Sequence, residues 1–315
     1  MIPRATPSPR AHLDGTLALV ERFAALAGGH PELPRLRALL DRPAALPEAV
    51  PPRRNALKYD AYLASGEAGT AWGVTINDRY EPEALRAALE PVAAAWGAPL
   101  DRLLPLQAAL ADADPVLTVA AGFDAADRPP RLKLYLQEDR WGAGVASAGE
   151  LTGLLEPLGC RIPAWISHDR RIGVVTLQFR GTEASAKAYL AGSTAALAAA
   201  GSPAEDLADR FAALCPMPGY YYLTLRMDPG APPRYAINKI YNPAHIAFEQ
   251  PRLWSIAWKE VRGLFAAAGR TDTFEAIDAV ARELGREGVA VVPTATAFED
   301  DGRSADLYCA AWRIP

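Results

Sequence analysis

Several stretches of the sequence place arginine, lysine and tyrosine at alternating positions, which gives one side of each stretch the chemistry to hold an anion. The clearest is the heptapeptide at 131–137, in which polar residues alternate with leucines; the polar members are Arg131, Lys133, Tyr135 and Gln137. Alternate residues of a β-strand point to the same side, so this stretch predicts a strand with one cationic and phenolic face. Ammonium and guanidinium groups form strong, charge-assisted hydrogen bonds with anionic oxygens.

The same pattern recurs in the second half of the chain. YYYLTLRMD, which begins at 220, predicts a strand face with Tyr220, Tyr222, Thr224 and Arg226. PRYAINKIYN, which begins at 233, predicts a face with Tyr235, Ile237, Lys239 and Tyr241. The recurrence indicates that these faces share a polar interior. The alternative is a solvated sheet surface from which lysine side chains extend into water.

β-Hairpins are the elements that would bring such faces together. Turn sequences separate alternating stretches. The first predicted strand begins with 53–60, and SGEAG at 65–69 turns it into the second, 70–77. The other predicted strand pairs are 116–123 with 131–137, 162–167 with 172–180, 220–227 with 234–242, and 289–298 with 304–313. Helical periodicity fills the intervals, at 81–96, 103–110, 150–158, 183–200, from 202 onward, 253–268 and 273–284.

This order of elements predicts an α+β fold. Ten strands with helices only between the hairpins would remove their edges by closing into an antiparallel β-barrel, and the helices would cover its apolar outer face. The polar faces would then line the lumen. We expect one domain over residues 1–315, with a helical segment within 1–50 packed on its outside.

Composition excludes several classes of protein. The net charge of −4 argues against a globally basic nucleic-acid-binding protein, so an anion site must come from a local cluster. The three cysteines are odd in number and widely spaced, which favours a reducing, cytoplasmic location over a disulfide framework. No apolar run is long enough to span a membrane, and no secretion signal is recognisable.

In these stretches the chain resembles the ABBA aromatic prenyltransferases, and most closely their cyanobactin peptide prenyltransferase branch. The residues that carry the resemblance are GFDAADRPPRLKLYLQED at 122–139 and the Lys-x-Tyr steps at Lys133/Tyr135 and Lys239/Tyr241. The order of elements extends it over about the whole chain. The resemblance implies a barrel of antiparallel strands inside a ring of helices.

The resemblance also implies transfer of a prenyl group from an allylic diphosphate. Fixed cations would bind the diphosphate, and the candidates are Lys133, Arg226, Lys239, Arg54 and Lys58. Aromatic faces would shield the allylic cation from water, and the candidates are Tyr135, Tyr220, Tyr222, Tyr241, Tyr308 and Trp312. The cyanobactin branch has a carboxylate on its first strand that orients or deprotonates the acceptor, and Asp60 is the candidate for that role.

No metal site is expected from the sequence. The Asp-Asp-x-x-Asp motif of the all-helical prenyl synthases is absent, so side chains would neutralise most of the diphosphate charge, with Mg²⁺ as an optional helper.

The sequence is compatible with more than one acceptor for the prenyl group. The leading interpretation is an electron-rich group of a peptide natural product, as in ribosomally made and modified peptides. A small aromatic metabolite, such as an indole or phenol, and a non-catalytic barrel that binds its ligand without turnover are the alternatives. The bulk of Tyr222, Tyr241 and Trp312 favours a five-carbon dimethylallyl donor over a ten-carbon one.

Overall fold

The computed structural model describes residues 8–41, 59–67, 69–76, 82–102, 116–124, 127–137, 153, 155–161, 174–192, 205–217, 220–241 and 252–314. Its helices are α1 (Pro9–Leu26), α2 (Leu33–Asp41), α3 (Pro82–Trp96), α7 (Glu205–Leu214), α8 (Arg252–Ala267) and α9 (Thr271–Arg286). Its strands are β1 (Tyr59–Gly66), β2 (Gly69–Ile76), β3 (Val116–Phe123), β4 (Arg131–Gln137), β5 (Val174–Arg180), β6 (Glu183–Gly192), β7 (Tyr220–Met227), β8 (Arg234–Ile240), β9 (Val289–Glu299) and β10 (Ala305–Arg313).

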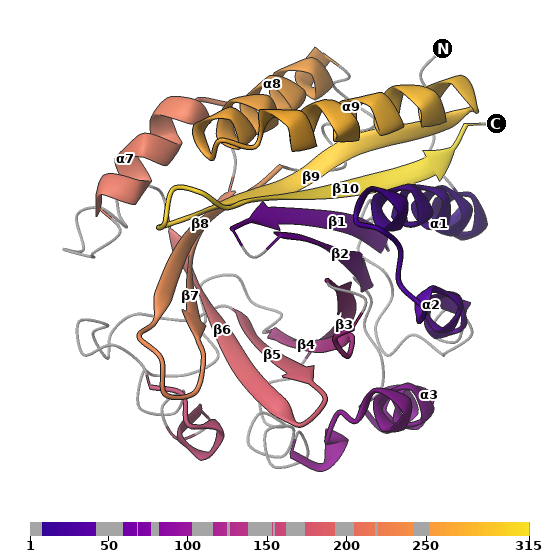
Figure 1. Ribbon diagram of the computed structural model, residues 1–315, viewed down its shortest axis with the longest axis vertical. Coiled ribbons are helices and arrows are strands. Elements are labelled where there is room, and N and C mark those ends of the chain that lie inside the picture. Colours follow the sequence, from indigo (N-terminus) through magenta and orange to yellow (C-terminus); the bar gives the residue numbers. More distant parts are fainter. Residues whose placement is uncertain are drawn as a thin grey trace.

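The ten strands form one closed barrel in which every neighbouring pair is antiparallel (Figure 1). The hairpins are β1–β2, β3–β4, β5–β6, β7–β8 and β9–β10, with helices such as α3, α7, α8 and α9 in the connections between them. Strand β1 closes the barrel by pairing with β10. The predicted fold class, a closed ten-stranded antiparallel barrel surrounded by helices, is confirmed. None of the described helices is long and apolar enough to span a membrane.

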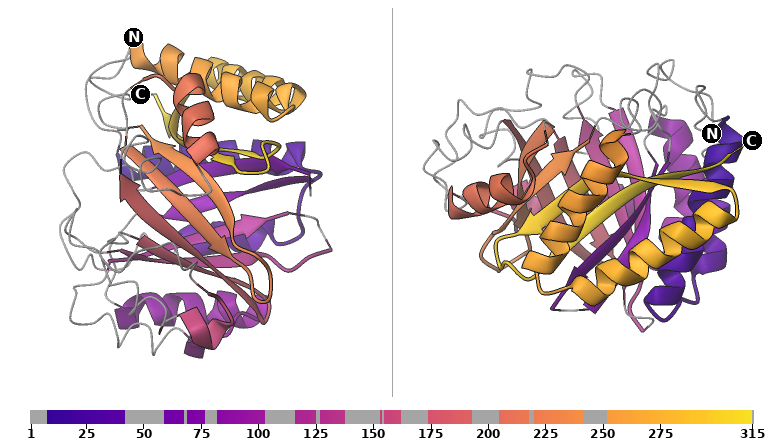
Figure 2. Two further views of the ribbon diagram at one scale, coloured as in Figure 1. Left: turned by 90° about the vertical axis from the view of Figure 1, so that its left-hand side faces the viewer. Right: turned by 90° about the horizontal axis from the view of Figure 1, so that it is seen from above.

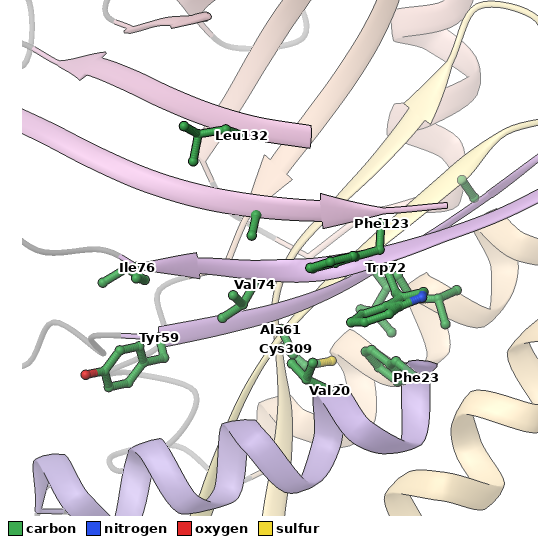
Figure 3. Packing of buried hydrophobic residues seen from close by; sticks show 14 of the residues in the cluster. Val20, Phe23, Tyr59, Ala61, Trp72, Val74, Ile76, Phe123, Leu132 and Cys309 are labelled. Atoms are coloured by element: carbon green, nitrogen blue, oxygen red, sulfur yellow. The ribbon is translucent and has the colours of Figure 1, made fainter. Parts of the chain in front are cut away.

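The hydrophobic core lies between the strands and the surrounding helices. Helix α1 packs on β10 and β1, and α9 packs on β9, so the N-terminal helix covers the outside of the barrel (Figures 1 and 2). Figure 3 shows the strand residues Trp72 and Phe123, which stack at 4.4 Å between ring centroids, near Val20 and Phe23 of α1. Burial of this apolar outer face leaves the polar alternate residues on the inner face.

Two predictions for this part of the chain are wrong: the helix over 183–200, and the pairing of 172–180 with 162–167, because β5 pairs with β4 and β6. Residues 183–192 form strand β6 rather than the first part of an alanine-rich helix, and they pair with β5 across a tight turn at Gly181. Alanine favours helices when nothing else decides. Here Ala186, Ala188 and Leu190 alternate with polar residues and are buried in the core, so packing of a period-two face overrides the propensity. The strand predicted at 162–167 and the helix at 103–110 lie outside the described residues.

Candidate active site

The inner face of β4 carries the charges that its sequence predicts. Leu132 and Leu134 belong to the core on the outer side, which turns Arg131, Lys133 and Tyr135 toward the interior. Lys133 is 4 % exposed and its Nζ lies 4.1 Å from the centroid of the Tyr62 ring on β1. A cation over an aromatic face at this distance is attracted by the ring quadrupole.

Strands β6 and β7 add further cations and phenols to the inner face. Lys187 of β6 lies directly opposite Arg226 of β7, and Tyr189 makes an edge-to-face contact with Tyr222 at 6.4 Å. Leu223 and Leu225 pack in the core on the outer side. The inward placement predicted for Tyr222 and Arg226 is therefore what the structure has.

Burial and repulsion between the cations of the inner face destabilise the protonated forms of its lysines and lower their pKa values. Burial, with Arg131 and Lys187 nearby, holds the pKa of Lys133 well below its usual value. Burial, with Arg226 opposite, lowers the pKa of Lys187 to about 8. Among the described residues no carboxylate forms an ion pair with Lys133 or Lys187. An arriving polyanion would relieve this mutual repulsion, so the cluster favours an anionic ligand.

Three carboxylates, those of Asp306, Glu299 and Asp228, lie close enough to reduce the positive potential of the inner face. Asp306 of β10 attracts Lys133 and Lys187, and it raises the pKa of Glu299 on β9 together with burial, the larger cause. Arg226 also pairs with Asp228, at 3.2 Å.

Tyrosine hydroxyls complete the inner wall. Burial raises the pKa of Tyr62 and of Tyr189 to about 12, and it holds the pKa of Tyr135 and of Tyr308 well above the ordinary value. Tyr62 and Tyr308 lie 5.4 Å apart between ring centroids. All of these phenols therefore stay protonated near neutral pH, where their O–H groups can donate to an anion and their faces can stabilise a cation.

Lys239 and Tyr241 do not belong to this inner face, and their predicted placement in the lumen is wrong. Lys239 shares its side of β8 with Ile237, which is in the core, and its Nζ lies 2.7 Å from Glu260 of α8. Tyr241 donates to the same carboxylate at 2.9 Å. Helix α8 covers the outside of the wall (Figure 1), so this group is a buried ion pair between the strand and the helix. The residues on the opposite side of β8 are Arg234, Ala236, Asn238 and Ile240.

Trp312 packs in one cluster with Tyr241, one of the tyrosines with which it was predicted to act, and its role in shielding the prenyl group stays a prediction. Its ring is fully buried beside Trp254 of α8, at 6.1 Å, in an apolar cluster that includes Met217 and Tyr241. Tyr220 lies opposite Ile240 in the β7–β8 register. Arg54 and Lys58 lie outside the described residues.

Asp60, the predicted base, lies on the inward-facing side of β1. Its neighbours Tyr59 and Ala61 pack in the outer core, and Asp60 itself is half-buried opposite Thr75 of β2. Its role stays a prediction.

Sequence reasoning missed Tyr62, Lys187 and Tyr189. The signals were present, because Tyr62 follows Asp60 by two residues and Lys187-x-Tyr189 repeats the step that drew attention to β4. The step Lys187-x-Tyr189 was overlooked because residues 183–200 were predicted to form a helix. The recurrence of Lys-x-Tyr on inward faces is thus real, but it joins β4 with β6 rather than with β8.

The described residues contain no group of three or more His, Cys, Asp or Glu side chains arranged to hold a metal ion. The inner face offers scattered carboxylates among cations, which is a donor set that Mg²⁺ uses only with the help of a ligand's own phosphates.

Comparison with solved structures agrees with the barrel. No family model and no curated protein matches the sequence. The chain is similar to 5-dimethylallyl tryptophan synthase from Streptomyces coelicolor, with a TM-score of 0.67 at 16 % identity over 97 % of this chain and 96 % of that one. It is similar to 6-dimethylallyltryptophan synthase from Micromonospora olivasterospora (TM-score 0.66, 19 % identity, 97 % and 98 % covered). It is also similar to AnaPT from Neosartorya fischeri (TM-score 0.66, 10 % identity, 98 % and 95 % covered). The likeness to the cyanobactin branch stays a prediction, and what these comparisons establish is that the chain has the ABBA prenyltransferase barrel fold.

Proposed function

We propose that this protein is a prenyltransferase that moves a dimethylallyl group from its diphosphate to an aromatic acceptor. The observation that carries the proposal is the inner face itself, on which Arg131, Lys133, Lys187 and Arg226 lie beside a wall of tyrosines. An apolar ligand held without turnover would need few charges. A diphosphate beside a carbocation needs both cationic side chains for the diphosphate and aromatic rings for the carbocation.

The cations of β4, β6 and β7 would act on the leaving group. When the carbon–oxygen bond of the donor breaks, its electron pair leaves with the diphosphate oxygen, and the added negative charge must be stabilised at once. Buried cations held in place before the reaction do this with little reorganisation. The protonated hydroxyls of Tyr135 and Tyr189 can add hydrogen bonds to the same oxygens.

The tyrosine faces would act on the carbon fragment. An allylic cation is attracted to aromatic rings and is destroyed by water, so a wall of buried rings both stabilises and protects it. The acceptor then forms a bond to the cation and releases a proton. Asp60 is the proposed acceptor of that proton, because it is a carboxylate on the inward side of β1.

For the acceptor, we favour a small indole or phenol over a peptide. Two of the similar structures are named as dimethylallyl tryptophan synthases and were solved in complex with DMASPP and Trp. Electrophilic attack requires an electron-rich ring, and an indole or phenol meets that requirement without a peptide around it.

The test is a direct search for product. Dimethylallyl diphosphate would be incubated with the protein and with tryptophan, other indoles, phenols and a tyrosine- or tryptophan-containing peptide, and mass spectrometry would detect an acceptor that has gained one dimethylallyl group. The proposal predicts gain on a small aromatic compound, abolished in Lys133→Met. Binding of donor without transfer to any acceptor would instead indicate a ligand-binding barrel.

A further inference from the structure

Asp306 of β10 is a carboxylate of the inner face that no described residue neutralises by direct contact. Ala305 and Leu307 on either side of it are buried in the outer core, so Asp306 itself lies on the inner side of the strand. Its partners on the two neighbouring strands are small, Ala64 of β1 and Ala297 of β9. Among the described residues its carboxylate forms neither a hydrogen bond nor an ion pair. Asp306 is thus a charge on the inner wall with small neighbours and no fixed counter-ion in the described part of the chain.

The cations of β4 reach as far as β1, the strand next to β10, because the chain has glycine where they cross β3. A Cβ atom at position 122 would lie 2.1 Å from Tyr62 Oη, 3.3 Å from Arg131 Nε and 3.4 Å from Lys133 Cε. Lys133 Nζ lies 4.1 Å from the centroid of the Tyr62 ring, and that ring lies 5.4 Å from the ring of Tyr308. Tyr308 is two residues from Asp306 on the same face of β10. The packing therefore brings the β4 cations to the part of the inner face that holds Asp306.

Asp306 acts on three cations of this cluster. Its charge attracts Arg131 and Lys133 of β4 and Lys187 of β6. Without a ligand, this negative charge offsets part of the repulsion among the cations. With a diphosphate bound to the same cations, the carboxylate and the ligand are like charges that repel each other across a buried site. Asp306 therefore stabilises the empty site and weakens the occupied one.

Three other carboxylates around the cluster lie against arginines. Asp124 forms an ion pair with Arg180, Asp228 lies 3.2 Å from Arg226, and Glu299 lies 3.9 Å from Arg234. An arginine at such a distance neutralises much of the charge that each of these carboxylates presents to the lysines. Asp306 has no such partner among the described residues, so its charge acts on the lysines in full.

The negative charge that the site must hold is largest after the reaction. When the carbon–oxygen bond of the donor breaks, the electron pair stays on the diphosphate oxygen, so the product has one more negative charge than the same group in the ester. The cations that stabilise this charge also retain the product, and product release limits turnover in many enzymes. We propose that Asp306 is an internal counter-ion of the cation cluster, which competes with the diphosphate and speeds its release once the prenyl group has been transferred. This inference rests on the proposed function.

The experiment measures binding of inorganic pyrophosphate by calorimetry at constant ionic strength and neutral pH, which requires neither a prenyl chain nor an acceptor. Asp306→Asn keeps the size of the side chain and removes its charge. It is expected to bind pyrophosphate at least about tenfold more tightly than wild type, because a like charge near the ligand is gone. Affinity differences between variants of one site lie mostly in the dissociation rate. Stopped-flow displacement of bound pyrophosphate, followed by tryptophan fluorescence, should therefore show dissociation slowed by a similar factor.

Two variants serve as controls. Asp306→Glu keeps the charge and should keep the wild-type affinity. Asp209→Asn makes the same change in net charge at an exposed position of α7 and should leave the affinity for pyrophosphate unchanged. If thermal melting shows that Asp306→Asn is unfolded, Asp306→Ser gives the same comparison with a smaller side chain.

Unchanged or weaker binding of pyrophosphate to Asp306→Asn would overturn the inference, as would an equal gain in Asp209→Asn. Weaker binding that appears only with Mg²⁺ present would also overturn it, because Asp306 would then be a ligand of the metal rather than a competitor of the diphosphate. Failure of wild type and Asp306→Asn alike to bind pyrophosphate would count against the proposed function itself.

Discussion

The buried lysines of β4 and β8 look alike in sequence, and replacing each by methionine should have opposite consequences. In Lys239→Met the carboxylate of Glu260 loses its counter-charge at 2.7 Å, and its remaining donors among the described residues are the Tyr241 hydroxyl and the Met217 backbone N–H. Removing one partner of a fully buried ion pair typically costs about 3–5 kcal/mol. We expect a loss of that size in the free energy of unfolding, with donor affinity retained by the folded protein.

Lys133→Met is the counterpart on the inner face. Burial and neighbouring cations hold the pKa of Lys133 well below its usual value, so its charged form opposes folding at neutral pH. The methionine variant should therefore be as stable as wild type or more stable. Its affinity for a diphosphate analogue should fall by about 2–4 kcal/mol, the cost of losing a charged donor in a desolvated site.

Urea denaturation followed by circular dichroism, together with calorimetry on each folded variant, measures both quantities. We expect a crossed result, in which Lys239 contributes to stability and Lys133 contributes to donor binding. Wild-type stability in Lys239→Met, or loss of donor affinity in that variant without loss of stability, would show that the assignment of inside and outside is wrong. Glu260→Gln provides an independent check, because it should lower stability without reducing donor affinity.

Three further outcomes follow from the geometry. Donor affinity should fall as pH rises through about 8, where Lys187 loses its proton, and Lys187→Arg should remove that fall, which titration of analogue binding between pH 7 and 9 would measure. Gly122→Ala should cost about 1–3 kcal/mol of stability through overlap with Tyr62 Oη, and adding Tyr62→Phe should recover much of the loss in urea denaturation; no recovery would place the overlap elsewhere. Asp60→Asn should lower turnover roughly a hundredfold in the product assay while analogue binding persists, and unchanged turnover would leave Asp60 without a role as base.

The barrel could be predicted because each hairpin can be recognised from its own local sequence. Alternation of apolar and polar residues on both sides of a short turn is a period-two signal, and closure follows when every strand has an apolar outer face and no protected edge. Strand β6 escaped prediction because four alanines between 184 and 191 suit a helix in isolation. Only the neighbouring β5 and β7, which pair along both of its edges, make the extended form the better one.

The side of the sheet on which a lysine lies is harder to predict than the strand that holds it. The residues that share a face with Lys133 on β4 and with Lys239 on β8 illustrate the difference. On β4 the residues that share a face with Lys133 are polar, and the opposite face is leucine throughout. On β8 the face of Lys239 includes Ile237, which packs in the core, whereas the opposite face carries Arg234, Ala236, Asn238 and Ile240. Each face of β8 thus holds one isoleucine, so the strand sequence does not identify the outward side. Lys239 is buried there because Glu260, from a helix some twenty residues later, supplies the opposite charge. That partner is a tertiary contact, which the strand sequence does not contain.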